Sequence, residues 1–248
     1  DYVVIKLPKW PFDKFLYAKR ELGTRMKATG EVMAIGTSFE MAIMKAVRGA
    51  EIGLSSLNLN KYQGKDLREE LKKLSDERLF TVFAALKAGI SVDEIFEITK
   101  IDRWFLNKLL NLVRYEKRIQ EEKLTRALYE EGKRLGYPDK ELEKISGQNL
   151  PCRKKAVYKM VDTCAAEFSA ATPYFYSTYD EASHDEALPF VQNSTKKRII
   201  VIGSGPIRIG QGIEFDYSSV HCVWTLKKLG YEVIIINNNP ETVSTDFD

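Results

Sequence analysis

A glycine-rich segment from Gly203 to Asp216 holds the residues best suited to chemistry in this chain. It follows a buried-type strand at 198–202 and precedes an expected helix at 217–229 and a second expected strand at 232–237. A dinucleotide fingerprint needs a glycine where Arg208 stands, a helix directly after the loop, and an acid at the end of the second strand, where Asn237 stands. The pattern therefore disfavours NAD or FAD binding.

Two interpretations of this segment stay open. In the first, Arg208, Glu214 and Asp216 line a polar passage or site at the carboxyl end of a parallel sheet, where ligands bind in open α/β folds. In the second, the glycines serve only a tight turn, and Glu214 or Asp216 caps the next helix. The polar run at 239–246 follows the second strand at the same sheet edge and slightly favours the site.

No nucleophile, base and acid stand together at catalytic spacing. His184 lies in an acidic stretch where we expect exposure, and His221 falls within the helix expected at 217–229. The sequence has three cysteines, Cys152, Cys164 and Cys222. They form no Cys-x-x-Cys pair, which disfavours a zinc site. Scattered thiols of this kind fit a reducing cytoplasm.

The composition is that of an ordinary globular protein. The 248 residues are 44% hydrophobic and 29% charged, with a net charge of +3 and a mean hydropathy of −0.30. Collagenous and mostly disordered chains are excluded. No apolar run approaches the roughly 18 residues of a membrane span, and the first residues show no signal pattern, so neither membrane insertion nor secretion is expected. A net charge of only +3 also argues against a nucleic-acid partner.

Residues 91–111 predict a short helix, a turn and a longer helix, the order of a helix-turn-helix motif. The residue types there indicate helix packing rather than DNA binding. Trp104 and Phe105 stand at the start of its second helix, where polar base-reading side chains belong. Acidic and basic residues are nearly balanced around it. We therefore expect helical packing or self-association there.

Residues 1–50 predict short strands followed by one helix. The expected pieces are a strand at 2–7, an amphipathic segment at 12–22 and two short β-runs within 26–36. A Thr37-x-x-Glu40 capping box then opens a helix that extends to Ala50. Because strand-bearing regions lie at both ends of the sequence, we expect the chain to be the middle of a longer protein.

Residues 51–168 predict an all-helical module with a core of its own. Ser91 and Asp102 are expected N-caps, and Gly89 is expected to close a helix. The expected helices are 67–74, 79–86, 91–98, 103–117, 121–135 and 139–145. Residues 169–195 are interpreted as an aromatic strap packed on a neighbour, followed by an exposed linker.

Several motifs resemble, in order, those of the large chain of carbamoyl-phosphate synthase. The motifs are MKATGEVMAIG at 26–36, IDRWFL at 101–106, VDTCAAEF at 161–168, YSTY at 176–179, GPIRIGQGIEFDY at 205–217 and NPETVSTD at 239–246. Gln211-Gly212 matches the bacterial two-chain type of this family. The resemblance covers essentially the whole chain.

The resemblance implies a mixed fold, with an all-α helical oligomerisation domain flanked by parts of two ATP-grasp halves. By this likeness, residues 1–50 are the C-terminal end of the carboxyphosphate-forming ATP-grasp (α+β) half, and residues 51–192 are the oligomerisation domain. Residues 193–248 are the first β-α-β of a Rossmann-like pre-ATP-grasp domain, which starts the carbamoyl-phosphate-forming half.

The resemblance also implies a function for the complete protein, a glutamine-dependent ligase. It would make carbamoyl phosphate from bicarbonate, glutamine-derived ammonia and two ATP, for arginine and pyrimidine biosynthesis. Arg208, Gly212 and Glu214 match positions of the family's carbamate tunnel. The ATP and Mg²⁺ or Mn²⁺ sites would lie outside this chain, so we expect no catalytic, cofactor-binding or metal residue within it and no turnover by it alone.

The partners implied are a small glutamine amidotransferase subunit and further copies of the large chain, which associate through the helical domain in the cytoplasm. Neither nucleic acid nor membrane is implied. An alternative from another class is a self-contained helical interaction module with a nucleotide-binding tail. Tight nucleotide binding by residues 193–248 alone would favour that alternative.

Overall fold

The structure is a computed structural model that describes residues 2–15, 17–28, 30–162, 167, 172–180, 185–192, 195–240 and 242–245. Within these ranges the strands form three two-stranded sheets. None of the helices there is long and apolar enough to cross a membrane. Cys164 and His184 lie outside the described residues, as do parts of the segments 161–168 and 239–246.

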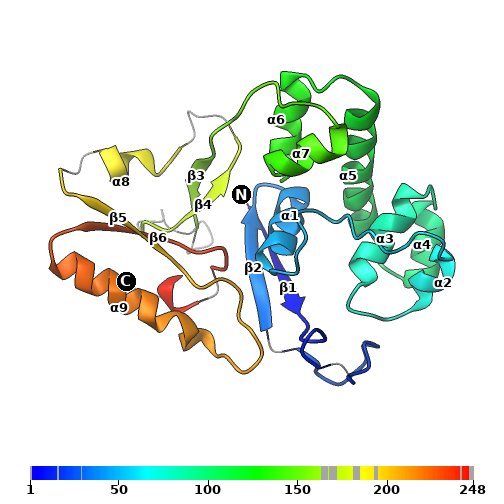
Figure 1. The fold of residues 1–248 in the computed structure, drawn as a ribbon, viewed down its shortest axis with the longest axis horizontal. Coiled ribbons are helices and arrows are strands. Elements are labelled where there is room, and N and C mark those ends of the chain that lie inside the picture. The colour runs from blue at the N-terminus through cyan, green and yellow to red at the C-terminus, as the bar shows by residue number, and fades with distance from the viewer. Residues whose placement is uncertain are drawn as a thin grey trace.

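The first sheet and helix lie at the centre of Figure 1. β1 (Val3–Lys9) pairs antiparallel with β2 (Gly30–Gly36), and α1 (Phe39–Gly49) packs against both strands. Only one of the two β-runs expected within 26–36 forms, because residues 26–28 lie outside any strand. The described residues of the expected amphipathic segment 12–22 form turns rather than a helix.

The predicted capping box at Thr37 is wrong by one residue. The N-cap of α1 is Ser38, whose Oγ accepts a hydrogen bond from the backbone N–H of Met41 at 3.2 Å. Ser38 has the extended backbone that an N-cap requires. Thr37 instead directs its hydroxyl toward the sulfur of Met41, at 3.9 Å.

Between residues 67 and 146, all of which the structure describes, six helices follow α1. They are α2 (Leu67–Lys72), α3 (Arg78–Lys87), α4 (Val92–Thr99), α5 (Arg103–Glu121), α6 (Arg126–Arg134) and α7 (Asp139–Ser146). The N-caps expected at Ser91 and Asp102 are confirmed, since their side chains accept from the N–H groups of Glu94 and Trp104. Gly89 follows α3 with a φ of +86°, which confirms the expected helix end.

The predicted division between helices at 117 and 121 is wrong. α5 runs on to Glu121, with Ile119 fully buried on its inner face. The next helix starts only at Arg126, because Thr125 is its N-cap and accepts from the N–H of Leu128. A helix continuous over 121–135 would lose this cap.

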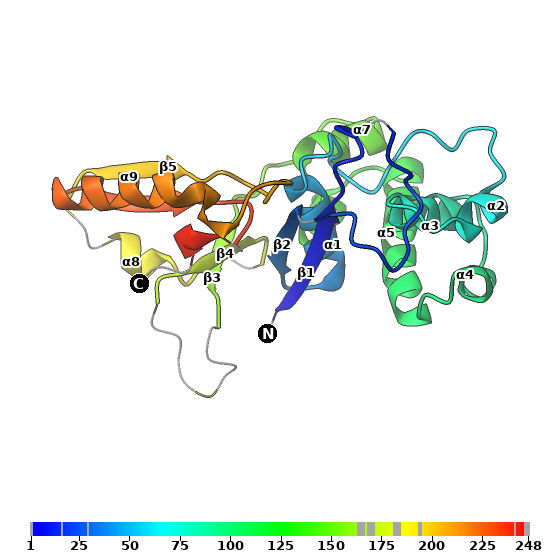
Figure 2. The same ribbon diagram turned by 90° about the horizontal axis from the view of Figure 1, so that it is seen from below.

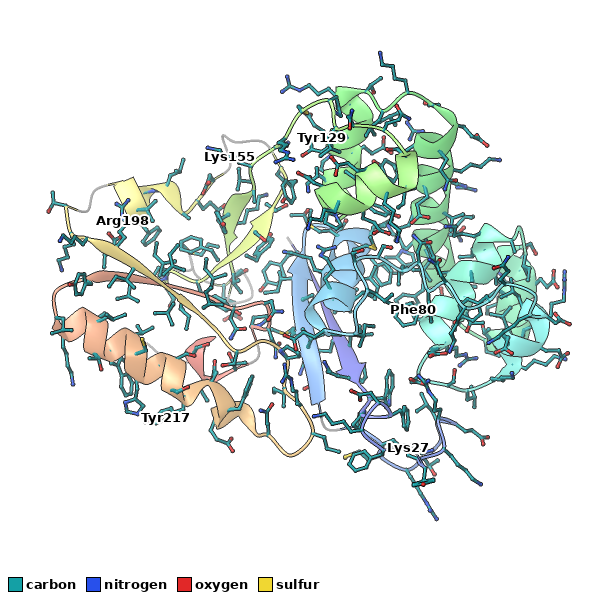
Figure 3. All side chains as sticks on the ribbon, in the orientation of Figure 1. Lys27, Phe80, Tyr129, Lys155, Arg198 and Tyr217 are labelled. Carbon is teal, nitrogen blue, oxygen red and sulfur yellow. The ribbon has the colours of Figure 1, made fainter. Side chains whose placement is uncertain are left out.

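The helical module does not have a core of its own, contrary to the prediction. One apolar cluster includes Ile43, Met44 and Val47 of α1 together with side chains from α2 to α7. Phe80 and Tyr129, labelled in Figure 3, are buried members of this cluster. The helices from α1 to α7 therefore fold around one shared core.

The expected aromatic strap contains a strand. β4 (Phe175–Thr178) pairs antiparallel with β3 (Val157–Met160), and this ribbon lies beside β2. Tyr176 packs in a second small apolar cluster with Ile35 and Val161, so the expected packing on a neighbour is confirmed. The segment expected to be a linker contains a short helix, α8 (Leu188–Gln192).

The last unit has the strand–helix–strand order expected from the sequence. β5 (Arg198–Ile202) and β6 (Glu232–Ile236) pair in parallel, and α9 (Tyr217–Lys228) connects them. A short 3-10 turn, η2 (Ile213–Asp216), directly precedes α9, and another, η3 (Val243–Thr245), follows β6. Figure 2 shows it at one end of the molecule, with α2 and α4 at the other.

Candidate functional site at the glycine loop

The glycine loop, residues 203–212, leaves β5 and crosses to the sheet formed by β1 and β2 (Figure 1). Gly203 N–H donates to the carbonyl of Ile236 at 2.7 Å, which keeps the start of the loop in register with β6. Gly205 has a φ of +83°, a left-handed conformation that other residues rarely adopt. Its N–H donates to Oδ1 of Asn237 at 3.3 Å.

The loop docks directly on β2. The N–H of Ile207 donates to the carbonyl of Glu31 at 3.2 Å, and the N–H of Met33 donates to Oδ1 of Asn239 at 3.0 Å. A Cβ at Gly30 would overlap the carbonyl oxygen of Ile207, so only glycine permits this approach. The loop thus joins β2 to the carboxyl end of the parallel pair.

Arg208 is held by an ion pair across this junction. Its Nη2 lies 2.6 Å from Oε2 of Glu51, the residue that follows the C-cap of α1. Lys9, at the end of β1, lies 3.9 Å from the same oxygen and donates to the backbone carbonyl of Glu51 at 3.2 Å. Burial lowers the pKa of Lys9, and the charge of Arg208 lowers it further, while Glu51 partly opposes both effects.

Gly212 lies beside the carboxylate of Glu214, whereas the side chain of Arg208 points toward Glu51. All three tunnel candidates are exposed. A Cβ on Gly212 would lie 2.6 Å from Oε1 of Glu214, a side chain that can move aside. The structure therefore places an exposed cation on one part of the loop and an exposed carboxylate beside its last glycine.

Asp216 does not cap α9, which corrects the second interpretation of the segment. It stands at the N-cap position, but neither its carboxylate nor another side chain caps the helix. Asp216 is fully buried, and its Oδ2 accepts from the N–H of Ser244 at 3.3 Å and from Nδ2 of Asn237 at 3.5 Å. Glu214 belongs to the preceding 3-10 turn. The polar residues after β6 thus meet the loop at one sheet edge, as the site interpretation expected.

The other candidate groups lie apart from the loop's charged residues. His221 is exposed on α9 and stacks edge-on against Tyr217 and Trp224, at 4.4 and 5.2 Å between ring centres. Cys152 and Cys222 are free thiols. Within the described ranges no three His, Cys, Asp or Glu side chains gather as a metal-ligand set.

The two aromatic residues at the start of the second helix in the helix-turn-helix pattern, residues 91–111, pack on α1. Trp104 and Phe105 lie 5.4 and 5.7 Å from the ring of Phe39, in edge-on and tilted geometries. This matches the expected helical packing. Both side chains stay about half exposed, at 51% and 45%.

Sequence analysis missed Glu51 and Lys9 as parts of the site. Arg208 and Glu51 are 157 residues apart, so no local spacing connects them. One signal was available, since a glutamate stands just after a helix end where glycine is usual. That signal shows an unusual position but does not identify its partner.

The comparisons with known proteins agree with this architecture. Residues 31–164 match the family described as "Carbamoyl-phosphate synthetase large chain, oligomerisation domain". Residues 195–248 match "Carbamoyl phosphate synthase preATP-grasp domain". The glycine loop thus lies within the second match and docks on a strand of the first.

Curated relatives align with the whole chain. The carbamoyl phosphate synthase large chain of Lachnoclostridium phytofermentans is 52% identical over an alignment of 260 positions, which covers 100% of this chain and 24% of the relative. The large chain of Methanobrevibacter smithii is 50% identical over an alignment of 257 positions, which covers 100% of this chain and 23% of the relative. The chain thus spans about a quarter of the length of these relatives. Since one family matches more than half of its residues, the chain belongs to the carbamoyl-phosphate synthetase large-chain family.

Proposed function

We propose that this chain is the central segment of a glutamine-dependent carbamoyl phosphate synthase large chain. In the proposed reaction, bicarbonate is phosphorylated, ammonia displaces the phosphate to give carbamate, and carbamate is phosphorylated in turn. The chain's part is architecture, since it joins the two ATP-using halves and forms a section of the passage for carbamate. The proposal rests on identity of about half over the full chain and on the docking of the glycine loop.

The division into parts follows the family resemblance. We assign residues 1–50 to the end of the carboxyphosphate-forming ATP-grasp half, 51–192 to the oligomerisation domain and 193–248 to the Rossmann-like start of the second half. ATP and Mg²⁺ would supply the phosphoryl group and neutralise its charge. We place their sites outside this chain, as the family resemblance implies.

We further propose two protein partners. The helical part would associate with other copies of the large chain, as the name of its matching family suggests. A small amidotransferase subunit would supply ammonia from glutamine. The free thiols Cys152 and Cys222 suit the reducing cytoplasm, where we place the protein.

The exposed residues of the glycine loop suit a passage for a small anion. The guanidinium of Arg208 has several N–H donors, so it can hold both Glu51 and a carboxylate-like anion. Gly212 lets the carboxylate of Glu214 lie where a larger residue would have its Cβ, and Glu214 can fix neighbouring donors. The single observation that carries the tunnel role is the docking of this loop on β2, which joins the parallel pair to the first sheet.

Gly212→Leu in the complete enzyme tests the tunnel. We expect glutamine hydrolysis to stay near the wild-type rate while carbamoyl phosphate output falls about tenfold or more, which is about 1.4 kcal/mol in an effective barrier. The leucine would fill the passage and push Glu214 aside. Gly23→Leu is the matched control, because Gly23 is also exposed and nothing lies within 4 Å of the place of its Cβ.

The paired result separates obstruction from general damage. Wild-type output by the Gly212 variant would refute the tunnel role. A loss shared equally by the Gly23 variant would also refute it, since nothing lies within 4 Å of the place of the Gly23 Cβ.

A further inference from the structure

Glu51 occupies a backbone conformation that glutamate rarely adopts. It follows Ala50, the C-cap of α1, and has a φ of +52°, in the left-handed region. Such a residue costs about 1–2 kcal/mol relative to the right-handed form, a cost that glycine avoids. Other helix ends in the described chain use glycine at positive φ, namely Gly89, Gly136, Gly147 and Gly230. A glutamate kept at this position calls for a compensating contact.

The side chain of Glu51 supplies that contact by joining three segments. Its carboxylate holds Arg208 of the glycine loop at 2.6 Å and Lys9 of β1 at 3.9 Å. The carboxylate also lies against the loop backbone, since a Cβ on Gly205 would lie 3.0 Å from its Oε1. The direction of the Arg208 side chain thus depends on this carboxylate, which also packs against the backbone of the loop.

The local charge balance makes this carboxylate important. Glu51 pairs with two cations, Lys9 and Arg208. Burial is the main cause of the lowered pKa of Lys9, and the charge of Arg208 lowers it further. Without the carboxylate the two cations would face each other unscreened, and Arg208 would turn away from Lys9. Glycine at position 51 would relieve the backbone but leave the cations without their counter-charge.

We propose that Glu51 is a positioning residue that fixes Arg208 at the carbamate passage, and that its left-handed backbone is retained for this purpose. The inference rests on the proposed tunnel function. It adds a contact between the end of α1 and the loop through which the first half of the protein sets the geometry of the passage. Glu51 itself does not touch the substrate.

The test is a double-mutant cycle in the full-length large chain with its amidotransferase subunit. The variants are Glu51→Gln, Arg208→Gln and both together, and the readout is carbamoyl phosphate formed per ADP released. We expect each single variant to lower this ratio about tenfold, in line with the cost of small misplacements in a reaction path. We expect the double variant to lose no more than either single one, because both changes break the same pair.

Two glycine variants separate positioning from stability. Glu51→Gly removes the strain together with the carboxylate, so we expect wild-type or higher thermal stability with the same loss of product per ADP. Lys100→Gly is the matched control, since Lys100 ends α4 with a φ of +56° and pairs with Glu97 one turn earlier. We expect it to keep the wild-type product ratio.

The possible results separate the positioning role of Glu51 from the proposed tunnel function. If Arg208→Gln lowers the ratio but both Glu51 variants keep it, the positioning role is wrong and the tunnel stands. Additive losses in the double variant, or an equal loss in Lys100→Gly, would also overturn the positioning role. If Arg208→Gln and Gly212→Leu both leave product formation unchanged, the proposed tunnel itself fails.

Discussion

Lys45 provides a quantitative test of the packing between α1, β2 and β4. Its Nζ donates to the carbonyls of Ile35 at 2.7 Å and Ser177 at 2.6 Å, and it lies 5.6 Å from the ring centre of Tyr176. Burial, and to a smaller extent the charge of Arg48, lowers its pKa from 10.5 to about 8. The charged form is thus disfavoured in the fold.

The sign of the pH effect follows from proton linkage. Between about pH 8 and pH 10.5 the unfolded chain binds a proton at Lys45 that the folded chain has lost. The free energy of unfolding therefore rises with pH across this window. At about 1.4 kcal/mol per tenfold change in proton affinity, the full rise is about 3 kcal/mol.

Lys45→Met removes the titrating amine and keeps an unbranched side chain. Urea unfolding of this chain, followed by circular dichroism from about pH 7 to about pH 10.5, gives the wild-type minus variant difference in free energy. We expect this difference to shift by about 3 kcal/mol in favour of the wild type as the pH rises. Tyr176 stays neutral here, because burial raises its pKa to about 12.

Lys45→Gln separates titration from hydrogen bonding. It keeps a neutral donor toward the two carbonyls, so its stability should differ from that of Lys45→Met by an amount that does not change with pH. A wild-type minus Met difference that is flat across the window would refute the argument. It would mean that Lys45 reaches water in the folded state.

Two further predictions concern the helical core. Gly132→Ala should lower the free energy of unfolding by about 2–3 kcal/mol in urea, because the new Cβ would overlap the hydroxyl of buried Tyr115; Gly23→Ala meets no atom within 4 Å and Gly23 has no positive φ, so an equal loss there would show that steric overlap is not the cause. Asp102→Ala should cost about 1 kcal/mol by removing the 2.7 Å bond from the N–H of Trp104, and Asp102→Asn should restore most of it; an Asn variant as unstable as the Ala variant would argue against capping.

Local chemistry made most of the helix ends predictable. Ser91 and Asp102 cap their helices as expected, because a short polar side chain can satisfy the free N–H groups of its own first turn. Gly89 likewise closes α3, since its positive φ is a property of the residue itself. The strand–helix–strand order at 198–236 follows from equally local signals, an aliphatic run on each side of an amphipathic stretch.

Predictions that depended on a distant partner succeeded less often. The strand at 175–178 was not expected, because a four-residue strand has little periodicity and its partner β3 lies across a long connection. The shared core was missed because helical spacing in α1 defines an apolar face without indicating which elements cover it. The boundary near residue 121 depended on choosing between Thr125 and earlier polar residues as the cap.

The site at the glycine loop combines both kinds of information. The glycines indicate positions where two backbone segments come close together, and Gly30 does lie against the carbonyl of Ile207. They do not say which backbone comes close, because glycine lacks a side chain that could select a partner. The partner segment is selected by side chains such as Glu51, whose carboxylate pairs with Arg208, 157 residues away in the sequence. The residue that breaks a local rule at a helix end is therefore one that links the loop to the end of α1.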